Sequence, residues 1–115
     1  MTKSRLSDYL NHIRQAANEA MAFVQGMNRH AFLNDRRTQH AVIRCLTIIG
    51  EAATKIMNDH SSFAEAHPEV SWQQMRGMRN QVVHGYFDIN LDTVWDTVLA
   101  SLPAMLEKLP PPIES

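Results

Sequence analysis

Four polar side chains that could take part in catalysis fall within eight positions of the second half of the chain. They are Arg79, Asn80, His84 and Tyr86. Arginine is a permanent cation whose planar guanidinium fits phosphate oxygens, and histidine titrates near neutral pH and can give or take a proton. A cation beside an acid–base group suits phosphodiester cleavage when no metal ion assists. The segment therefore indicates a candidate site for phosphodiester chemistry.

The spacing of Arg79 and His84 limits how the two side chains can act together. In an ideal helix, five residues correspond to about 140° around the axis, so the two positions would not share a face. Either the helix ends between them, or a second copy of the chain completes the site. Gly85 favours a helix end near His84. The alternative interpretation is a surface arginine and a histidine that is favoured at a helix end by the helix dipole.

The same residues carry a resemblance to a known family. The run Arg79–Asn80–x3–His84–x–Tyr86 resembles the R-x4-6-H motif of HEPN-domain ribonucleases. With its tyrosine included, the run resembles the HepT-like subgroup of that family, also called DUF86. Further stretches resemble the same subgroup and extend the likeness over nearly the whole chain: Ala41–Ala52, His67–Trp72, Tyr86–Ile89 and Val94–Trp95.

The resemblance implies a metal-independent endoribonuclease that is the toxin of a toxin–antitoxin pair. It would cut RNA, such as tRNA or mRNA, by attack of the ribose 2′-hydroxyl, and would leave a 2′,3′-cyclic phosphate. Arg79 and His84 would be catalytic, with Asn80 beside them. The implied partner is a minimal nucleotidyltransferase, the antitoxin, which would add AMP to Tyr86. No cofactor is expected.

A second function of a different class is compatible with the same residues. The chain could be a non-catalytic helical module that binds a nucleotide or substrate for a nucleotidyltransferase. The cluster around Arg79 would then be only an anion site. Toxicity on expression together with RNA cleavage would favour the ribonuclease.

The predicted helix over residues 36–58 has two informative faces. Its apolar arc is too wide for one interface and predicts a helix packed on two sides, either at the centre of the domain or between subunits. Its polar positions form one stripe, in which Arg44 and Glu51 could line a cleft near Arg79; the alternative is a solvated face. Gly50 costs about 1 kcal/mol relative to alanine in a helix, and such a glycine often marks close approach of two helices.

Hydrophobic periodicity predicts an all-α fold, an antiparallel bundle of four or five helices with short loops. We expect helices over 4–25, 36–58, 71–85 and from Asp88 or Asn90 to 109, a loop over 27–35 and a polar connector over 59–70. Pro103 should kink or split the final helix, because it lacks a backbone donor; Ser101 could cap the second segment. Residues 110–115 should form an exposed tail. The modest core and the wide apolar arc predict a homodimer.

Length and composition limit the number of domains and the classes of function. The 115 residues suit one domain over 1–115, and the net charge of −1 gives no general attraction for nucleic acid. Basic residues gather locally, and could face one cleft, at Arg29, Arg36, Arg37, Arg44, Arg76 and Arg79. The single cysteine, Cys45, excludes an internal disulfide, and no metal-binding motif is present. Neither a signal peptide nor a membrane-spanning segment is apparent, so we expect the cytoplasm and no membrane partner.

Overall fold

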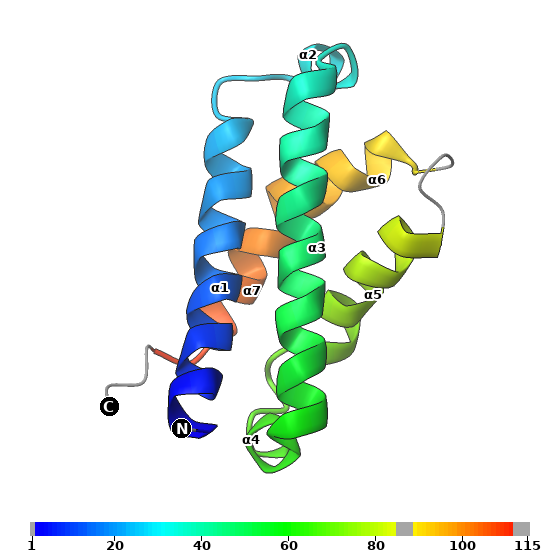
Figure 1. Cartoon of the computed structure of the whole chain (residues 1–115). Coiled ribbons are helices and arrows are strands. Elements are labelled where there is room, and N and C mark those ends of the chain that lie inside the picture. Colours follow the sequence, from blue (N-terminus) through cyan, green and yellow to red (C-terminus); the bar gives the residue numbers. More distant parts are fainter. Residues whose placement is uncertain (1, 85–88, 112–115) are drawn as a thin grey trace.

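Helices make up all the regular secondary structure in the part of the chain that the structure describes (Figure 1). The computed structural model describes residues 2–84 and 89–111, and the side chains of residues 5–80 and 89–111. The elements are α1 (Thr2–Phe23), α2 (Arg29–Leu33), α3 (Arg36–Asp59), α4 (Ser61–Ala66), α5 (Trp72–His84), α6 (Leu91–Asp96), the π-helix η2 (Thr97–Ser101) and α7 (Leu102–Lys108). The predicted all-α class is confirmed.

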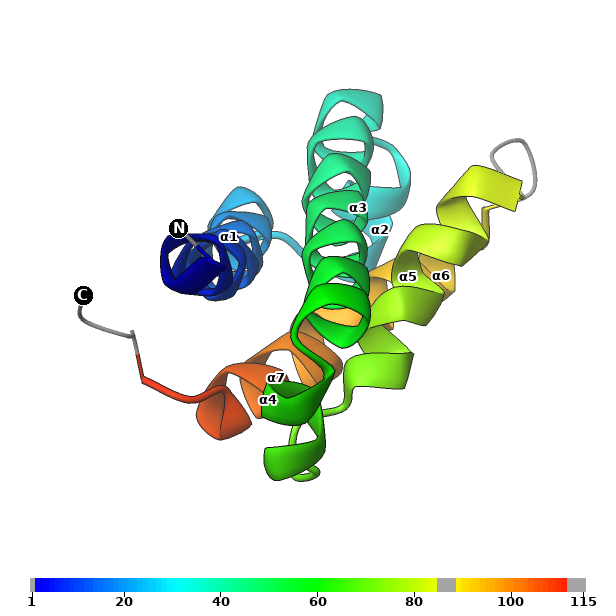
Figure 2. The same ribbon diagram turned by 60° about the horizontal axis from the view of Figure 1, so that its bottom comes forward.

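The helix α3 lies at the centre of the molecule. Figures 1 and 2 show α1 on one side of α3 and α5 on the other. The buried apolar residues of α3 are Val42, Cys45, Leu46, Ile49, Ala52, Ala53 and Ile56. The wide apolar arc predicted a helix packed on two sides, and its place within one domain accounts for that arc. Burial raises the pKa of the Cys45 thiol to about 11, as expected for a core residue rather than a nucleophile.

The second layer consists of α6, η2 and α7, which cross behind α1 and α3 in the view of Figure 1. The break expected at Pro103 is a π-helical turn, in which the N–H of Leu102 donates to the carbonyl of Thr97, five residues earlier. Because of this longer turn, the helix continues to Pro103 without a break. Ser101 keeps helical dihedral angles and makes no side-chain cap, so its predicted role as a cap is wrong.

Two segments predicted to lack regular structure contain short helices. The segment 27–35 holds α2, and the connector 59–70 holds α4. Asn28 caps α2 by accepting from the N–H of Ala31 at 2.8 Å. Asp35 caps α3, and hydrogen bonds from the N–H and hydroxyl of Thr38 hold the pKa of its carboxyl below the usual range.

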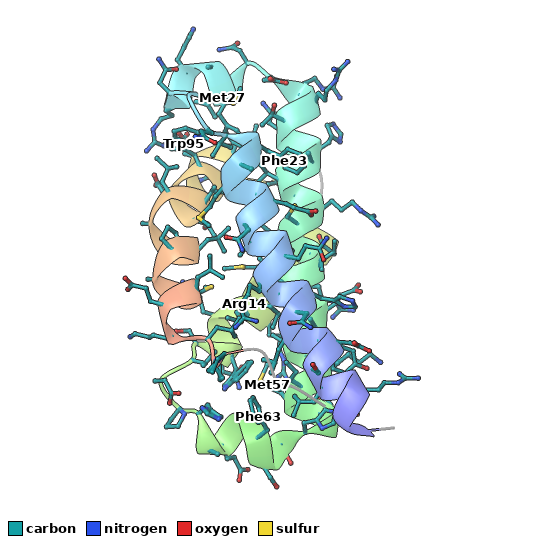
Figure 3. The ribbon with its side chains drawn as sticks, turned by 90° about the vertical axis from the view of Figure 1, so that its left-hand side faces the viewer. Arg14, Phe23, Met27, Met57, Phe63 and Trp95 are labelled. Atoms are coloured by element: carbon teal, nitrogen blue, oxygen red, sulfur yellow. The ribbon has the colours of Figure 1, made fainter. Side chains whose placement is uncertain are left out.

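Polar contacts tie the second layer to the rest of the molecule. The Arg29 guanidinium on α2 pairs with Asp92 at 2.8 Å and with Asp96 at 2.7 Å, both on α6. Arg14 lies on the α7 side of α1 and donates to the carbonyl of Pro110 (Figure 3). Within the described residues, none of the helices has the length and apolarity needed to cross a membrane.

Candidate active site

The helix α5 carries the candidate residues and is continuous from Trp72 to His84. Of the two alternatives left open by the sequence, a helix end between Arg79 and His84 is therefore ruled out. The two positions are about 140° apart around one helix axis. A single copy of α5 consequently does not present positions 79 and 84 on the same face. The side chain of His84 and the whole of Tyr86 lie outside the described part of the chain.

The position of Arg79 is set by a close contact between α5 and α3. A Cβ atom built on Gly50 would lie 2.3 Å from the Cβ of Arg79, 2.8 Å from its backbone nitrogen and 2.9 Å from the carbonyl oxygen of Met75. Only glycine allows the two backbones to come this close. Met75 and Met78, on the same helix, are buried in the core. Gly50 thus fixes where α5 holds Arg79.

The Arg79 side chain is partly enclosed, with 38% of its surface exposed. Its Nε atom is buried, has no hydrogen-bond partner among the described residues and lies 4.0 Å from a carboxylate oxygen of Glu51. Its Nη1 donates to the side-chain oxygen of Asn80 at 3.3 Å. Because the ion pair is long and Glu51 is 62% exposed, it holds Arg79 only weakly. The guanidinium can therefore bind a phosphate as well.

The structure brings only some of the predicted residues together. Glu51 and Asn80 contact Arg79. Arg44 lies on the exposed face of α3, two turns before Glu51, and none of the hydrogen bonds and ion pairs found among the described residues joins it to Arg79. The prediction that the arginines could face one basic cleft is wrong for Arg29, because that side chain pairs with Asp92 and Asp96 on α6.

Several residues next to this site were not selected by sequence reasoning. A groove of about 380 Å³ between α1 and α3 shares Glu51 with the site, and its lining includes Tyr9, His12 and Lys55. Tyr9 and His12 come from a helix some forty residues earlier, so no local spacing links them to Glu51. The pair Glu51 and Lys55, four residues apart on one helix face, was the only local signal. Among the described residues, no three His, Cys, Asp or Glu side chains gather as metal ligands.

Comparison with known proteins gives the family. The family model described as ribonuclease HepT-like matches residues 13–111. The chain belongs to the HepT-like family. The match contains all of α3 and α5, and therefore the whole Gly50–Arg79 contact.

Three curated relatives are similar to this chain over most of their length. A Thermococcus cleftensis protein named a probable ribonuclease HepT is 40% identical over 101 residues, covering 88% of this chain and 89% of the relative. A Methanocaldococcus jannaschii protein named as a candidate RNase is 35% identical over 109 residues, covering 95% and 97%. A candidate RNase of Caldanaerobacter subterraneus subsp. tengcongensis is 35% identical over 97 residues, covering 84% of each chain. No solved structure gave a significant match.

Proposed function

We propose that this chain is a metal-independent endoribonuclease and the toxin of a toxin–antitoxin pair. The observation that carries the proposal is the position of Arg79, held at the α3–α5 contact with its guanidinium partly exposed. His84 follows five positions later on the same helix. HepT-like family membership and relatives named as ribonucleases support the same activity.

The reaction is cleavage of RNA by its own 2′-hydroxyl. His84 takes the proton of this hydroxyl, the 2′-oxygen bonds to the adjacent phosphorus, and the bond from phosphorus to the 5′-oxygen breaks. The departing 5′-oxygen takes up a proton from water, His84 returns its proton to water, and the products are a 2′,3′-cyclic phosphate and a 5′-hydroxyl end. Arg79 stabilises the negative charge that develops on the phosphoryl oxygens.

Three other polar residues support this chemistry. Asn80 orients the Arg79 guanidinium through its side-chain oxygen. Glu51, 4.0 Å from Nε of Arg79, restrains the guanidinium without closing the site. Arg44, exposed on α3, binds a phosphate farther along the RNA strand.

The active form is a homodimer with composite sites. Positions 79 and 84 lie about 140° apart on one continuous helix, so Arg79 of one copy acts with His84 of the other. A twofold axis would bring two such pairs into one cleft.

The proposed function is tested by RNA cleavage in the presence of EDTA. We expect the wild type to cut single-stranded RNA and to leave cyclic phosphate ends, identified by mass spectrometry. His84→Ala should lower the rate by about 100-fold or more, the usual range for a lost acid–base group. A dependence on added divalent metal, or an unchanged rate in His84→Ala with a native circular dichroism spectrum, would contradict the mechanism.

The same proposal assigns the control of the toxin to Tyr86. We expect the partner nucleotidyltransferase to transfer AMP from ATP to the Tyr86 hydroxyl, releasing pyrophosphate. Each AMP adds a bulky base and a negative phosphate close in sequence to Arg79 and His84. A phosphate paired with Arg79 would take the place of the RNA phosphate.

Mass spectrometry after incubation with the partner and ATP measures this modification. The adduct should have the mass of one or more AMP units, map to Tyr86 and abolish cleavage. Tyr86→Phe should keep cleaving RNA and escape the partner, because it lacks the acceptor oxygen. If Tyr86→Phe is modified and silenced like the wild type, the assignment to Tyr86 is wrong.

A further inference from the structure

A groove next to the candidate active site has features of a binding site for a nucleobase. It lies between α1 and α3, has a volume of about 380 Å³ and is lined by Tyr9, His12, Ile48, Glu51, Ala52 and Lys55. Ile48 and Ala52 are four residues apart, so they lie on one face of α3 and form an apolar floor. Polar and charged side chains stand around this floor.

The groove and the Arg79 site share one side chain. Glu51 lines the groove, and its carboxylate lies 4.0 Å from Nε of Arg79. A strand whose phosphate binds Arg79 can therefore place a neighbouring nucleoside on the groove side of Glu51. This arrangement makes the groove an extension of the RNA path across α3 towards α1.

The lining residues match the chemistry of a single-stranded base. The Tyr9 ring is half-buried, and His60 holds it edge-on at a centroid distance of 6.3 Å. Lys55 is exposed at the groove, and Arg5 lies four residues before Tyr9 on α1, on the same side of that helix. An aromatic ring provides a stacking surface for any base, and the cations attract the backbone. The Glu51 carboxylate can accept from a base amino group.

Resting on the proposed ribonuclease function, we infer that this groove is a base-stacking subsite for the nucleoside next to the scissile phosphate. Single-stranded RNA is the substrate class, because only an unpaired base can leave its stack and enter the groove. Tyr9 stacks on the base and Lys55 binds a backbone phosphate beside it. The apolar floor of Ile48 and Ala52 suits a base rather than a second phosphate.

Binding of an oligoribonucleotide with 2′-O-methyl groups tests the subsite. Such an oligonucleotide lacks the attacking hydroxyl, so fluorescence anisotropy measures affinity without cleavage. Tyr9→Leu should weaken binding by about 10-fold, within the range of lost stacking, whereas Tyr9→Phe keeps the ring and should bind like the wild type. Lys55→Gln should weaken binding and reduce its salt dependence, whereas the control Lys108→Gln, exposed on α7, should change neither.

Oligonucleotides with one abasic position separate stacking from a general loss of affinity. Removing the base that enters the groove should weaken binding to the wild type and have little further effect on Tyr9→Leu. If the abasic nucleotide and Tyr9→Leu weaken binding by independent factors at every position of the oligonucleotide, the groove does not bind the base and the inference is wrong. Cleavage unaffected by Tyr9→Leu would also reject the subsite while leaving the ribonuclease function intact. Base-dependent binding without any cleavage would instead reject the ribonuclease function and leave the groove as a base-binding site only.

Discussion

Gly50→Ala should lower the rate of RNA cleavage by about 100-fold or more while the protein remains folded, because a displacement near 1 Å of a catalytic group can cost this much. A Cβ at Gly50 would meet the Cβ and the backbone nitrogen of Arg79 and the carbonyl of Met75. These are atoms of the α5 backbone or fixed to it, so a change of side-chain rotamer cannot relieve the contact. The helix α5 itself must move away from α3 and carry Arg79 with it.

The effect of Gly50→Ala on stability should be smaller than its effect on activity. Crowding a packed interface costs about 1–3 kcal/mol, and alanine in place of glycine returns about 1 kcal/mol of helix propensity. We therefore expect a loss of about 0–2 kcal/mol in the free energy of unfolding, measured by urea denaturation. Most of the protein would be folded when its cleavage rate is measured.

Gly77→Ala is the matched control for this substitution. Gly77 lies on α5, and a Cβ built there meets nothing within 4 Å. The alanine should raise the free energy of unfolding by about 1 kcal/mol and leave cleavage unchanged. Full activity in Gly50→Ala, or equal losses in both variants, would show that the contact at Gly50 does not position the catalytic arginine.

The long helices could be predicted because their burial is periodic in sequence. Alternating steps of three and four residues identified α1, α3 and the α6–α7 segment, and the wide apolar arc of α3 predicted its central place. The helices α2 and α4 have five and six residues, so they are too short to show a repeat. Asn28 was a local signal for α2, since asparagine is a strong cap, but the segment was interpreted as a loop.

The candidate site was partly predictable for a related reason. Arg79, Asn80 and His84 are close in sequence, so a motif can reveal them, and Gly50 indicated a helix contact without naming its partner. The contact of Gly50 with Arg79 joins residues 29 positions apart, and the pairing of Arg29 with Asp92 joins residues 63 positions apart. Only the packing of the helices determines such pairs. The groove beside Glu51 was not predicted for the same reason, because α1 supplies two of its six lining residues.

A mixed dimer of Arg79→Ala and His84→Ala should recover cleavage that neither variant has alone. Each substitution should reduce the rate of its homodimer by about 100- to 1,000-fold, the usual effect of removing one group that stabilises the transition state or transfers a proton. In the mixed dimer, one composite site has Arg79 from one chain and His84 from the other. The second site lacks both residues. Activity should return to about half that of the wild-type dimer, by counting intact sites.

The reciprocal mixed dimer is the control that decides between shared and separate sites. It pairs a wild-type chain with a chain carrying both Arg79→Ala and His84→Ala. If each site takes one residue from each copy, both sites are broken and this dimer is inactive. If each chain forms its own site, the same dimer keeps half the activity and the mixture of single variants stays inactive. Two affinity tags purify each mixed dimer, and light scattering confirms its mass. A wild-type chain that remains a monomer and still cleaves RNA would contradict the shared site, since positions 79 and 84 would then have to act from one helix that holds them about 140° apart.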